Sequence, residues 1–272
     1  RDDVESRGLG DVYKRQLVTR NSYHNDLLFK IIDIEDNIAY LKGIDVRLYA
    51  DSELDDLQLV EENLLIKKKE DREEVTKLQK MIQLDRSEYF YLPGKILHLD
   101  GDKDYLERCI SFYKEMHLEA YGINIKEKDM KEEITKYLET YKPDIVIITG
   151  HDSFKKGAKD KDKNASYQNS SNFTEAVKEA RKYEKSQDKL IIIAGACQSN
   201  YEELIKAGAN FASSPKRINI HALDPAIIAS LVALSPKNKE IDLLSLIEKT
   251  HYGSAGMGGI ITSGTMYVGY PR

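Results

Sequence analysis

The sequence predicts an α/β protein whose main domain is a doubly wound, mostly parallel sheet, preceded by a small β-barrel domain and a charged linker helix. Three observations predict this architecture. After residue 93, short apolar runs alternate with helical segments, which is the pattern of βαβ units. Before residue 61, short apolar runs are separated by turn residues, as in small antiparallel barrels. Between them, 15 charged residues fall within residues 61–88.

Length and composition limit the classes of protein to consider. The chain has 272 residues, which corresponds to about two domains of roughly 150 residues each, and 41% of them are hydrophobic. Its net charge is −5, so no overall basic field attracts nucleic acid, and we expect no nucleic-acid partner. No apolar run is long enough to cross a bilayer, so we expect no membrane association. Two cysteines are too few for the disulfide framework of a small secreted scaffold, so we expect free thiols in a reducing, cytoplasmic compartment.

The first 60 residues divide into two parts. Residues 1–16 have neither an initiator methionine nor the apolar core of a signal peptide, and we interpret them as a non-native scar. Residues 17–60 contain several short apolar runs broken by turns, which predicts a small barrel of about five strands, similar to an SH3 domain. A domain of this size is marginally stable alone.

Residues 61–93 predict a linker helix. Acidic and basic side chains are nearly balanced there, eight against seven in residues 61–88, so the lysine run at its start does not form a nucleic-acid patch. A narrow apolar stripe is formed by Val75, Leu78 and Ile82. We expect an exposed helix that links two domains.

The α/β domain is expected over residues 94–236. Near-continuous runs of isoleucine, valine and leucine predict parallel strands that are covered on both faces. The expected strands are 95–99, 120–125, 144–149, 189–194 and 210–214, and the expected helices are 103–116, 127–141, 172–185, 201–207 and 225–234. Residues 237–272 then form a C-terminal appendage, with a helix over 241–249 and a glycine-rich hairpin.

Reactive residues follow three of the predicted strands. Asp100 follows the first strand, His151 follows the third, and Cys197 follows the fourth. Open parallel sheets carry their reactive groups beyond the carboxyl ends of the strands, so the histidine and the cysteine are expected at the same edge. A thiol beside an imidazole is the arrangement of a nucleophile and its general base. We therefore predict that Cys197 is a catalytic nucleophile and His151 its acid–base partner.

The segment after Cys197 favours a reactive thiolate. Ser199 and Glu202 match the S-x-x-E capping box, so we expect a helix to begin directly after the cysteine, with its positive end near the sulfur. A helix N-terminus and a nearby imidazolium both lower the pKa of a thiol. The other cysteine, Cys109, lies within a predicted amphipathic helix, and we expect it only to fill space in the core or at the surface.

Further residues at these strand ends are candidates for orienting the imidazole or contacting substrate. Asp152 or Asp100 could orient the His151 ring or pair with a basic substrate side chain. Gly150 and Gln198, which flank the two catalytic candidates, belong to the same set.

A rival for the general base is His221, which follows the fifth predicted strand. It could instead cap the following helix or line the substrate pocket. We expect no metal ion and no cofactor at this site.

The order of these elements resembles that of caspase-type and gingipain-type cysteine peptidases. His151 precedes Cys197 by 46 residues, close to the separation of about 50 in caspases, and the cysteine follows an alanine. The sequence departs from that pattern in two ways: a glycine precedes the histidine instead of following it, and Ser199 occupies a glycine position. The resemblance implies a caspase-like or flavodoxin-like form of the doubly wound sheet.

Longer strings resemble the YabG family of sporulation-specific cysteine peptidases of endospore-forming Firmicutes. The strings are PGKILHLDGDKDYLERC, KPDIVIITGHD, the segment from IIAGACQSN to HALDP, and GMGGI. The resemblance runs from about residue 17 to the end. It implies a protease that processes spore coat and cortex-associated proteins in the mother cell, near the forming coat, and cuts after basic residues. The catalytic histidine and cysteine of the family fall on His151 and Cys197.

Two other functional classes are open from the residues alone. A receiver-like signalling module is suggested by residues 142–149 and by the acidic pair of Asp100 and Asp102, but no carboxylate stands at the position of the phosphate acceptor. An amidotransferase-like thiol hydrolase would need a G-x-C-x-G elbow, and Ser199 breaks that motif. Both alternatives fit the residues less well than a peptidase.

Overall fold

The computed structural model describes residues 16–60, 64–155, 157–158, 160 and 163–271. Residues 1–15, most of the segment interpreted above as a scar, lie outside the described residues. The chain divides into two compact units, residues 1–69 and 70–272, and each is described by itself. Within the described residues, no helix is both long enough and apolar enough to cross a membrane.

The first unit is a small antiparallel β domain. Its described strands form one sheet in the order β4-β3-β2-β1-β5. Their bounds are β1 Leu17–Arg20, β2 Phe29–Glu35, β3 Ile38–Gly43, β4 Tyr49–Glu53 and β5 Leu57–Leu59. Alternate residues such as Phe29 and Ile31 face one side, where they pack with Leu41 into a buried cluster. The predicted strand-rich domain is therefore present, with a core of its own.

Helix α2 (Leu64–Met81) is more than a solvated connector. Val75 and Leu78 are each only 4% exposed and belong to the core of the second unit, with Ile82 packed beside them. Asp71 forms a bidentate ion pair with Arg108 on helix α3 (Lys103–Glu115), with both N–O distances at 2.7 Å. The apolar stripe seen in the sequence thus anchors the helix.

The second unit is built on a mostly parallel sheet. Its described strands follow the order β12-β11-β10-β9-β7-β8. The parallel strands are β7 Ile96–Asp100, β8 Ala120–Asn124, β9 Ile145–Thr149, β10 Ile191–Ala194 and β11 Phe211–Ser213. These bounds confirm the five strands predicted from the apolar runs to within two residues. The runs are nearly continuous in isoleucine and valine because both faces of the sheet are covered.

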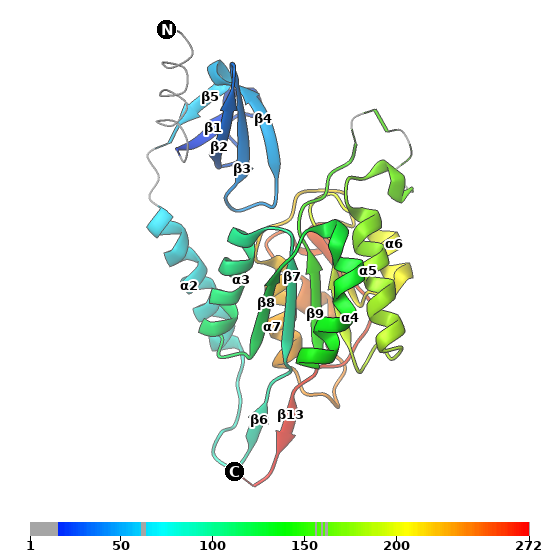
Figure 1. The fold of residues 1–272 in the computed structure, drawn as a ribbon. Helices are drawn as coiled ribbons and strands as arrows, with labels where there is room; N and C mark the ends of the chain where they lie inside the picture. The colour runs from blue at the N-terminus through cyan, green and yellow to red at the C-terminus, as the bar shows by residue number, and fades with distance from the viewer. Residues whose placement is uncertain (1–15, 61–63, 156, 159, 161–162, 272) are drawn as a thin grey trace. The chain divides into compact units, whose positions relative to one another are not determined.

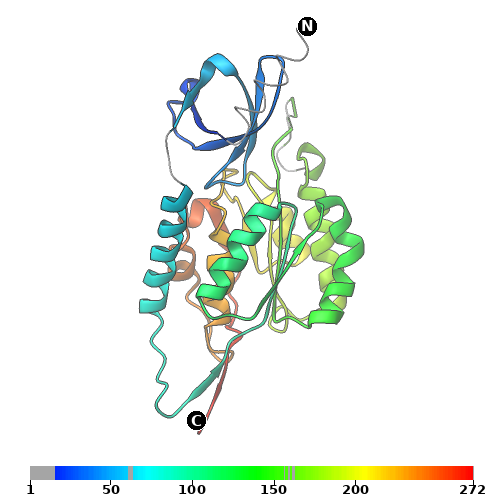
Figure 2. The same ribbon diagram turned by 60° about the vertical axis from the view of Figure 1, so that its left-hand side comes forward.

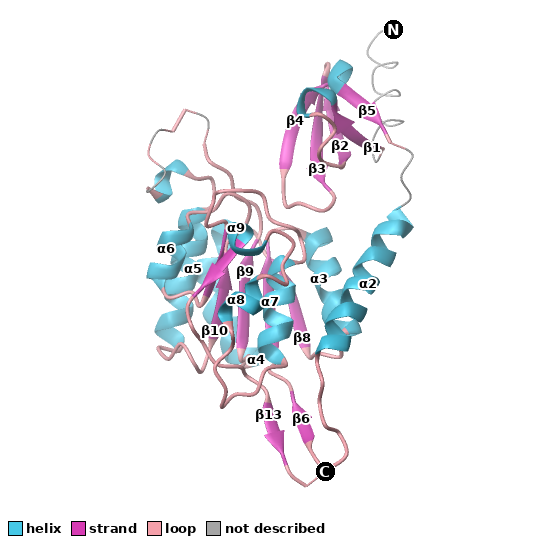
Figure 3. Ribbon diagram, turned by 180° about the vertical axis from the view of Figure 1, so that it is seen from behind, coloured by secondary structure: helices cyan, strands magenta, loops and turns pink. Residues whose placement is uncertain are grey.

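Helices cover the two faces of this sheet (Figures 1 and 2). Helices α2, α3 and α7 (Asp224–Ala233) supply apolar side chains to the cluster on one face. Helices α4 (Met130–Tyr141), α5 (Ser170–Tyr183) and α6 (Tyr201–Ala207) supply those on the other. The view from behind shows α7 together with the short helices α8 (Leu243–Ile247) and α9 (Gly253–Gly256) (Figure 3).

The C-terminal segment differs from the predicted hairpin. Strand β12 (Met257–Gly259) pairs antiparallel with β11, whereas β13 (Tyr267–Gly269) pairs with β6 (Phe90–Leu92). The glycines explain the first pairing, because a side chain at Gly259 would collide with Phe211 and one at Gly258 would press on Tyr201. The glycine-rich run therefore lets an edge strand approach the sheet closely, and it does not form a local turn.

Candidate active site

The strand order brings the sequence-predicted residues to one edge of the sheet. Strands β7, β9 and β10 are neighbours, with Asp100 paired in register with Thr149, and Ile148 with Ala194. His151 follows β9 by two residues and Cys197 follows β10 by three. The carboxyl ends of adjacent parallel strands are where open α/β sheets carry their functional groups.

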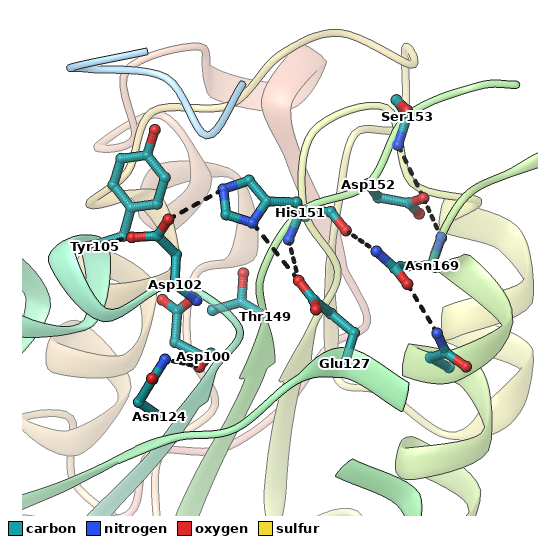
Figure 4. A network of polar contacts seen from close by, with 12 residues as sticks. Asp100, Asp102, Tyr105, Asn124, Glu127, Thr149, His151, Asp152, Ser153 and Asn169 are labelled. Atoms are coloured by element: carbon teal, nitrogen blue, oxygen red, sulfur yellow. Dashed lines mark hydrogen bonds and ion pairs between the residues drawn. The ribbon is translucent and has the colours of Figure 1, made fainter. Parts of the chain in front are cut away.

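The His151 imidazole lies between two carboxylates (Figure 4). Its Nδ1 lies 3.6 Å from Oε1 of Glu127, and its Nε2 lies 3.5 Å from Oδ2 of Asp102. The ring of Tyr105 lies at 5.7 Å, centroid to centroid. The side chain is 18% exposed but its Nε2 atom is buried, so the surroundings of the imidazole are largely dry.

Glu127 begins a short 3-10 turn just after β8, and its carboxylate is directed at His151. Oε1 accepts a hydrogen bond of 2.9 Å from the backbone N–H of His151. Burial alone would raise the pKa of Glu127, but hydrogen bonds from the His151 side chain and backbone outweigh it, so the pKa is lowered. Glu127 therefore carries a negative charge beside the imidazole.

Two aspartates after β7 have different neighbours. Asp102 is the N-cap of α3, and its Oδ1 accepts hydrogen bonds from the N–H groups of Asp104 and Tyr105. Asp100 is fully buried; its Oδ1 accepts the N–H of Asp102, and its Oδ2 lies 3.5 Å from Nε2 of His98. Asp102 thus faces the His151 ring directly, while Asp100 lies beside a second histidine.

Asp152 joins the loop after β9 to the loop after β10. Its Oδ2 accepts hydrogen bonds from the hydroxyls of Ser170 and Ser199, the latter at 2.9 Å. Its Oδ1 accepts the N–H groups of Ser153 and Asn169, at 2.9 and 2.7 Å. Burial raises the pKa of Asp152 more than these hydrogen bonds lower it. The carboxylate is directed at these loop donors.

The Cys197 thiol is enclosed by backbone. The residue has 0% exposure, and its Sγ accepts a hydrogen bond of 3.2 Å from the N–H of Ile220. The thiol in turn lies 3.8 Å from the carbonyl oxygen of Ile220, to which it donates, so one backbone residue contacts the sulfur as both donor and acceptor. The other thiol, that of Cys109, is buried in the apolar cluster beneath α3, as the sequence predicts.

Gln198 adopts a left-handed conformation with φ of 56° directly after the cysteine. Its side-chain oxygen accepts the N–H of Phe154 at 3.3 Å, and its side-chain nitrogen donates to Asn219 at 3.2 Å. Together with the Ser199–Asp152 bond, these contacts tie the loop that carries Cys197 to the loop that carries His151. The bond from the Thr149 hydroxyl to the carbonyl of Gly195, at 2.8 Å, adds to the connection.

The predicted capping box after Cys197 is wrong. Helix α6 begins at Tyr201 with Asn200 as its N-cap. The Ser199 hydroxyl accepts the N–H of Ala196 at 2.9 Å and donates to Asp152, and Glu202 forms an ion pair with Arg217. The serine therefore stabilises the loop between the strand and the helix, because Asp152 offers its hydroxyl a buried acceptor.

His221 belongs to a separate polar cluster. Its ring stacks on that of His251 with centroids 3.5 Å apart, and its Nδ1 accepts the N–H of Leu223. Nδ1 of His251 lies 2.9 Å from Oδ1 of Asp224, and its Nε2 lies 3.4 Å from Oε2 of Glu74. The ligand atoms of His221, Asp224 and His251 lie within 4.8 Å of one another, so these residue types could hold a metal ion. The stacked rings and mutual hydrogen bonds also fit a structural clamp.

Comparison with known proteins decides the family. The family model for YabG peptidase U57 matches residues 13–271. The chain belongs to the YabG peptidase family. It is 40% identical over 284 residues to the sporulation-specific protease YabG of Bacillus subtilis (strain 168), covering 94% of this chain and 96% of that protein. Family membership supports a peptidase with a role in sporulation, and it favours this class over the receiver-like and amidotransferase-like alternatives.

For a YabG-family peptidase, the structure adds two carboxylates that sequence reasoning missed as partners of the histidine. Asp102 belongs to the same acidic run as Asp100, so its position after β7 could have identified it as a candidate partner of His151. Glu127 gave a weaker signal, because its proximity to His151 depends on β8 and β9 lying on either side of β7. That order is set by packing and cannot be read from local sequence.

Proposed function

We propose that this YabG-family chain is a cysteine endopeptidase with Cys197 as nucleophile and His151 as general acid and base. The observation that carries the proposal is the pair of hydrogen-bonded loops at the carboxyl ends of β9 and β10. One loop bears an imidazole beside two carboxylates, and the other bears a thiol that accepts a backbone hydrogen bond. These are the parts that thiol-dependent acyl transfer needs.

The reaction then follows from these groups. The Cys197 thiolate attacks the scissile carbonyl, and the C–N bond breaks as the His151 imidazolium gives its proton to the leaving amine. Water next attacks the thioester, losing a proton to the neutral imidazole and releasing the acid and the thiolate. Backbone N–H groups of Cys197 and of the loop that follows His151 are the donors we propose for the oxyanion.

A preference for cutting after basic residues is supported by charge. Asp102 and Glu127 place two carboxylates beside His151, more negative charge than one imidazolium can neutralise. A substrate arginine or lysine would supply the missing positive charge. In this proposal the substrates are spore coat and cortex-associated proteins, met in the mother cell near the forming coat, in keeping with the sporulation-specific name of the relative.

The finer fold assignments are also proposals. A histidine after one strand and a cysteine after its parallel neighbour support a caspase-like sheet. A five-stranded antiparallel order in the described part of the first unit supports an SH3-like barrel.

A second candidate for the base is His221. Ile220, its neighbour in the chain, donates the hydrogen bond to Sγ of Cys197, so the His221 segment contacts the thiol through its backbone. In that case the cluster with Asp224 and His251 would orient the ring.

The test compares single alanine variants in the full chain. We expect Cys197→Ala and His151→Ala each to reduce cleavage of an arginine-containing peptide and of spore coat extract by at least about 100-fold. Cys109→Ser and His221→Ala should retain most activity, and all variants should melt near the wild-type temperature. An active Cys197→Ala protein would overturn the cysteine mechanism, and an active His151→Ala beside an inactive His221→Ala would move the base to His221.

A further inference from the structure

Glu127 contacts both the backbone and the side chain of His151. Its Oε1 accepts the backbone N–H of His151 at 2.9 Å and lies 3.6 Å from Nδ1 of the ring of the same residue. One carboxylate oxygen thus faces both the main chain and the side chain of the proposed acid–base residue. A charge held in this way limits the rotation of the imidazole.

The surrounding backbone leaves space for this carboxylate. Gly101 follows β7 and Gly150 follows β9, and a Cβ atom at either position would overlap the Glu127 carboxylate. Neither glycine has a positive φ, so a side chain is excluded by lack of space and not by backbone conformation. Two strand ends therefore meet around the same carboxylate.

The second carboxylate beside the ring, that of Asp102, also caps a helix. Asp102 caps α3 with its Oδ1, and only its Oδ2 faces Nε2 of His151. Its negative charge is partly balanced by the positive end of that 13-residue helix. The Tyr105 ring from α3 also lies beside the imidazole, and the Asn169 side chain donates to the His151 carbonyl at 2.8 Å. The carboxylate of Asp152, the next residue in the chain, bonds to serine hydroxyls.

We propose that Glu127 is the positioning residue of the catalytic centre: its carboxylate holds Nδ1 of His151 in the protonated form and leaves Nε2 to exchange protons with Cys197 and the leaving amine. The role parallels the carboxylate of a serine-protease triad, which fixes the tautomer and stabilises the imidazolium without accepting the proton. This proposal rests on the proposed cysteine-peptidase function.

The decisive experiment is the separate measurement of kcat and KM for Glu127→Gln in the full chain, with an arginine-containing peptide as substrate. We expect kcat to fall on the order of 10- to 100-fold, with KM within about twofold of wild type, because the loss affects proton transfer and not substrate binding.

The matched control is Asp129→Asn, which removes the same charge from the exposed end of the same 3-10 turn. It should leave kcat and KM at the wild-type values. Glu127→Asp keeps the charge on a side chain that is shorter by one methylene, so kcat should fall by less than in Glu127→Gln while KM stays near that of wild type. This second variant decides the matter if Glu127→Gln fails to fold.

The outcomes separate the two proposals. If Cys197→Ala or His151→Ala retains activity, the proposed function fails whatever Glu127 does. If both are inactive while Glu127→Gln, or Glu127→Asp in its place, keeps the wild-type kcat, the positioning role alone is overturned. A lowered kcat at unchanged KM in Glu127→Gln, partly recovered in Glu127→Asp and absent from Asp129→Asn, supports it.

Discussion

His151 shows how much of a site is decided by single side chains. The residue type and its place after a strand are visible in the sequence, and they are sufficient to predict His151 as a site residue. Its carboxylate neighbours are Glu127 and Asp102, each near one ring nitrogen. Asp102 lies in the acidic run after β7 and is visible in sequence, but Glu127 follows β8, so its proximity to His151 depends on the strand order.

Gly150→Ala tests the space around Glu127 at this scale. The added Cβ would displace the end of a flexible side chain, so we expect a stability loss at the lower end of the range of about 1–3 kcal/mol. Peptide cleavage should fall about tenfold or more, because the carboxylate is pushed away from His151. Thermal unfolding and kcat measured on the same preparation check both parts.

The control for that variant is Gly157→Ala, where an added Cβ meets nothing within 4 Å. Its positive φ of 84° costs some stability by itself. Activity should nevertheless remain at the wild-type level. A Gly150→Ala protein as active as this control would show that the carboxylate does not depend on the glycine.

At the scale of secondary structure elements, the predictable and unpredictable parts have different physical causes. Runs such as Ile145–Thr149 are apolar throughout because they are covered on both faces, and this composition is visible in sequence. Strands β12 and β13 contain glycines and few core residues, and their partners, β11 and β6, are far away in the chain. The local glycine pattern of the C-terminal segment therefore predicts a hairpin, whereas its strands pair with β11 and β6.

Leu78→Ala measures how firmly α2 is attached to the second unit. Leu78 is 4% exposed in the core cluster shared with α3, so its truncation should cost about 2–5 kcal/mol of unfolding free energy. Lys77→Ala, on the exposed face one residue earlier, should change the stability by less than about 0.5 kcal/mol. Equal urea midpoints for the two variants would mean that α2 is only a connector.

At the scale of the whole molecule, the cluster around His251 connects segments that are far apart in sequence. Burial lowers the pKa of His251, but the hydrogen bond and charge of Asp224 and the charge of Glu74 outweigh it, so the pKa lies above its ordinary value of 6.5. Burial raises the pKa of Glu74 itself. Through Glu74 and Asp224, His251 thus joins α2 to the start of α7.

The sign of this linkage gives a pH prediction. A raised histidine pKa stabilises the fold fully below about pH 6.5, and the contribution is lost as the pH rises through the folded-state value. Relative to wild type, His251→Gln should lose about 1.5–3 kcal/mol near about pH 6, and progressively less as the pH rises through the folded-state pKa of His251. Urea unfolding of both proteins over this pH range, in the presence of a chelator, measures the difference.

The burial of Cys197 has a kinetic consequence. With no exposed surface, its sulfur meets a reagent or a polypeptide only when the segment ending at Ile220 moves away from it. The rate at which a small alkylating agent labels this thiol is therefore the product of two quantities: the fraction of molecules in which that segment is open, and the reactivity of the thiol in the open form. If labelling is slower than that of a free thiolate, the closed conformation, in which Cys197 is buried, predominates. Opening of the segment that covers the thiol would then limit the rate of the enzyme.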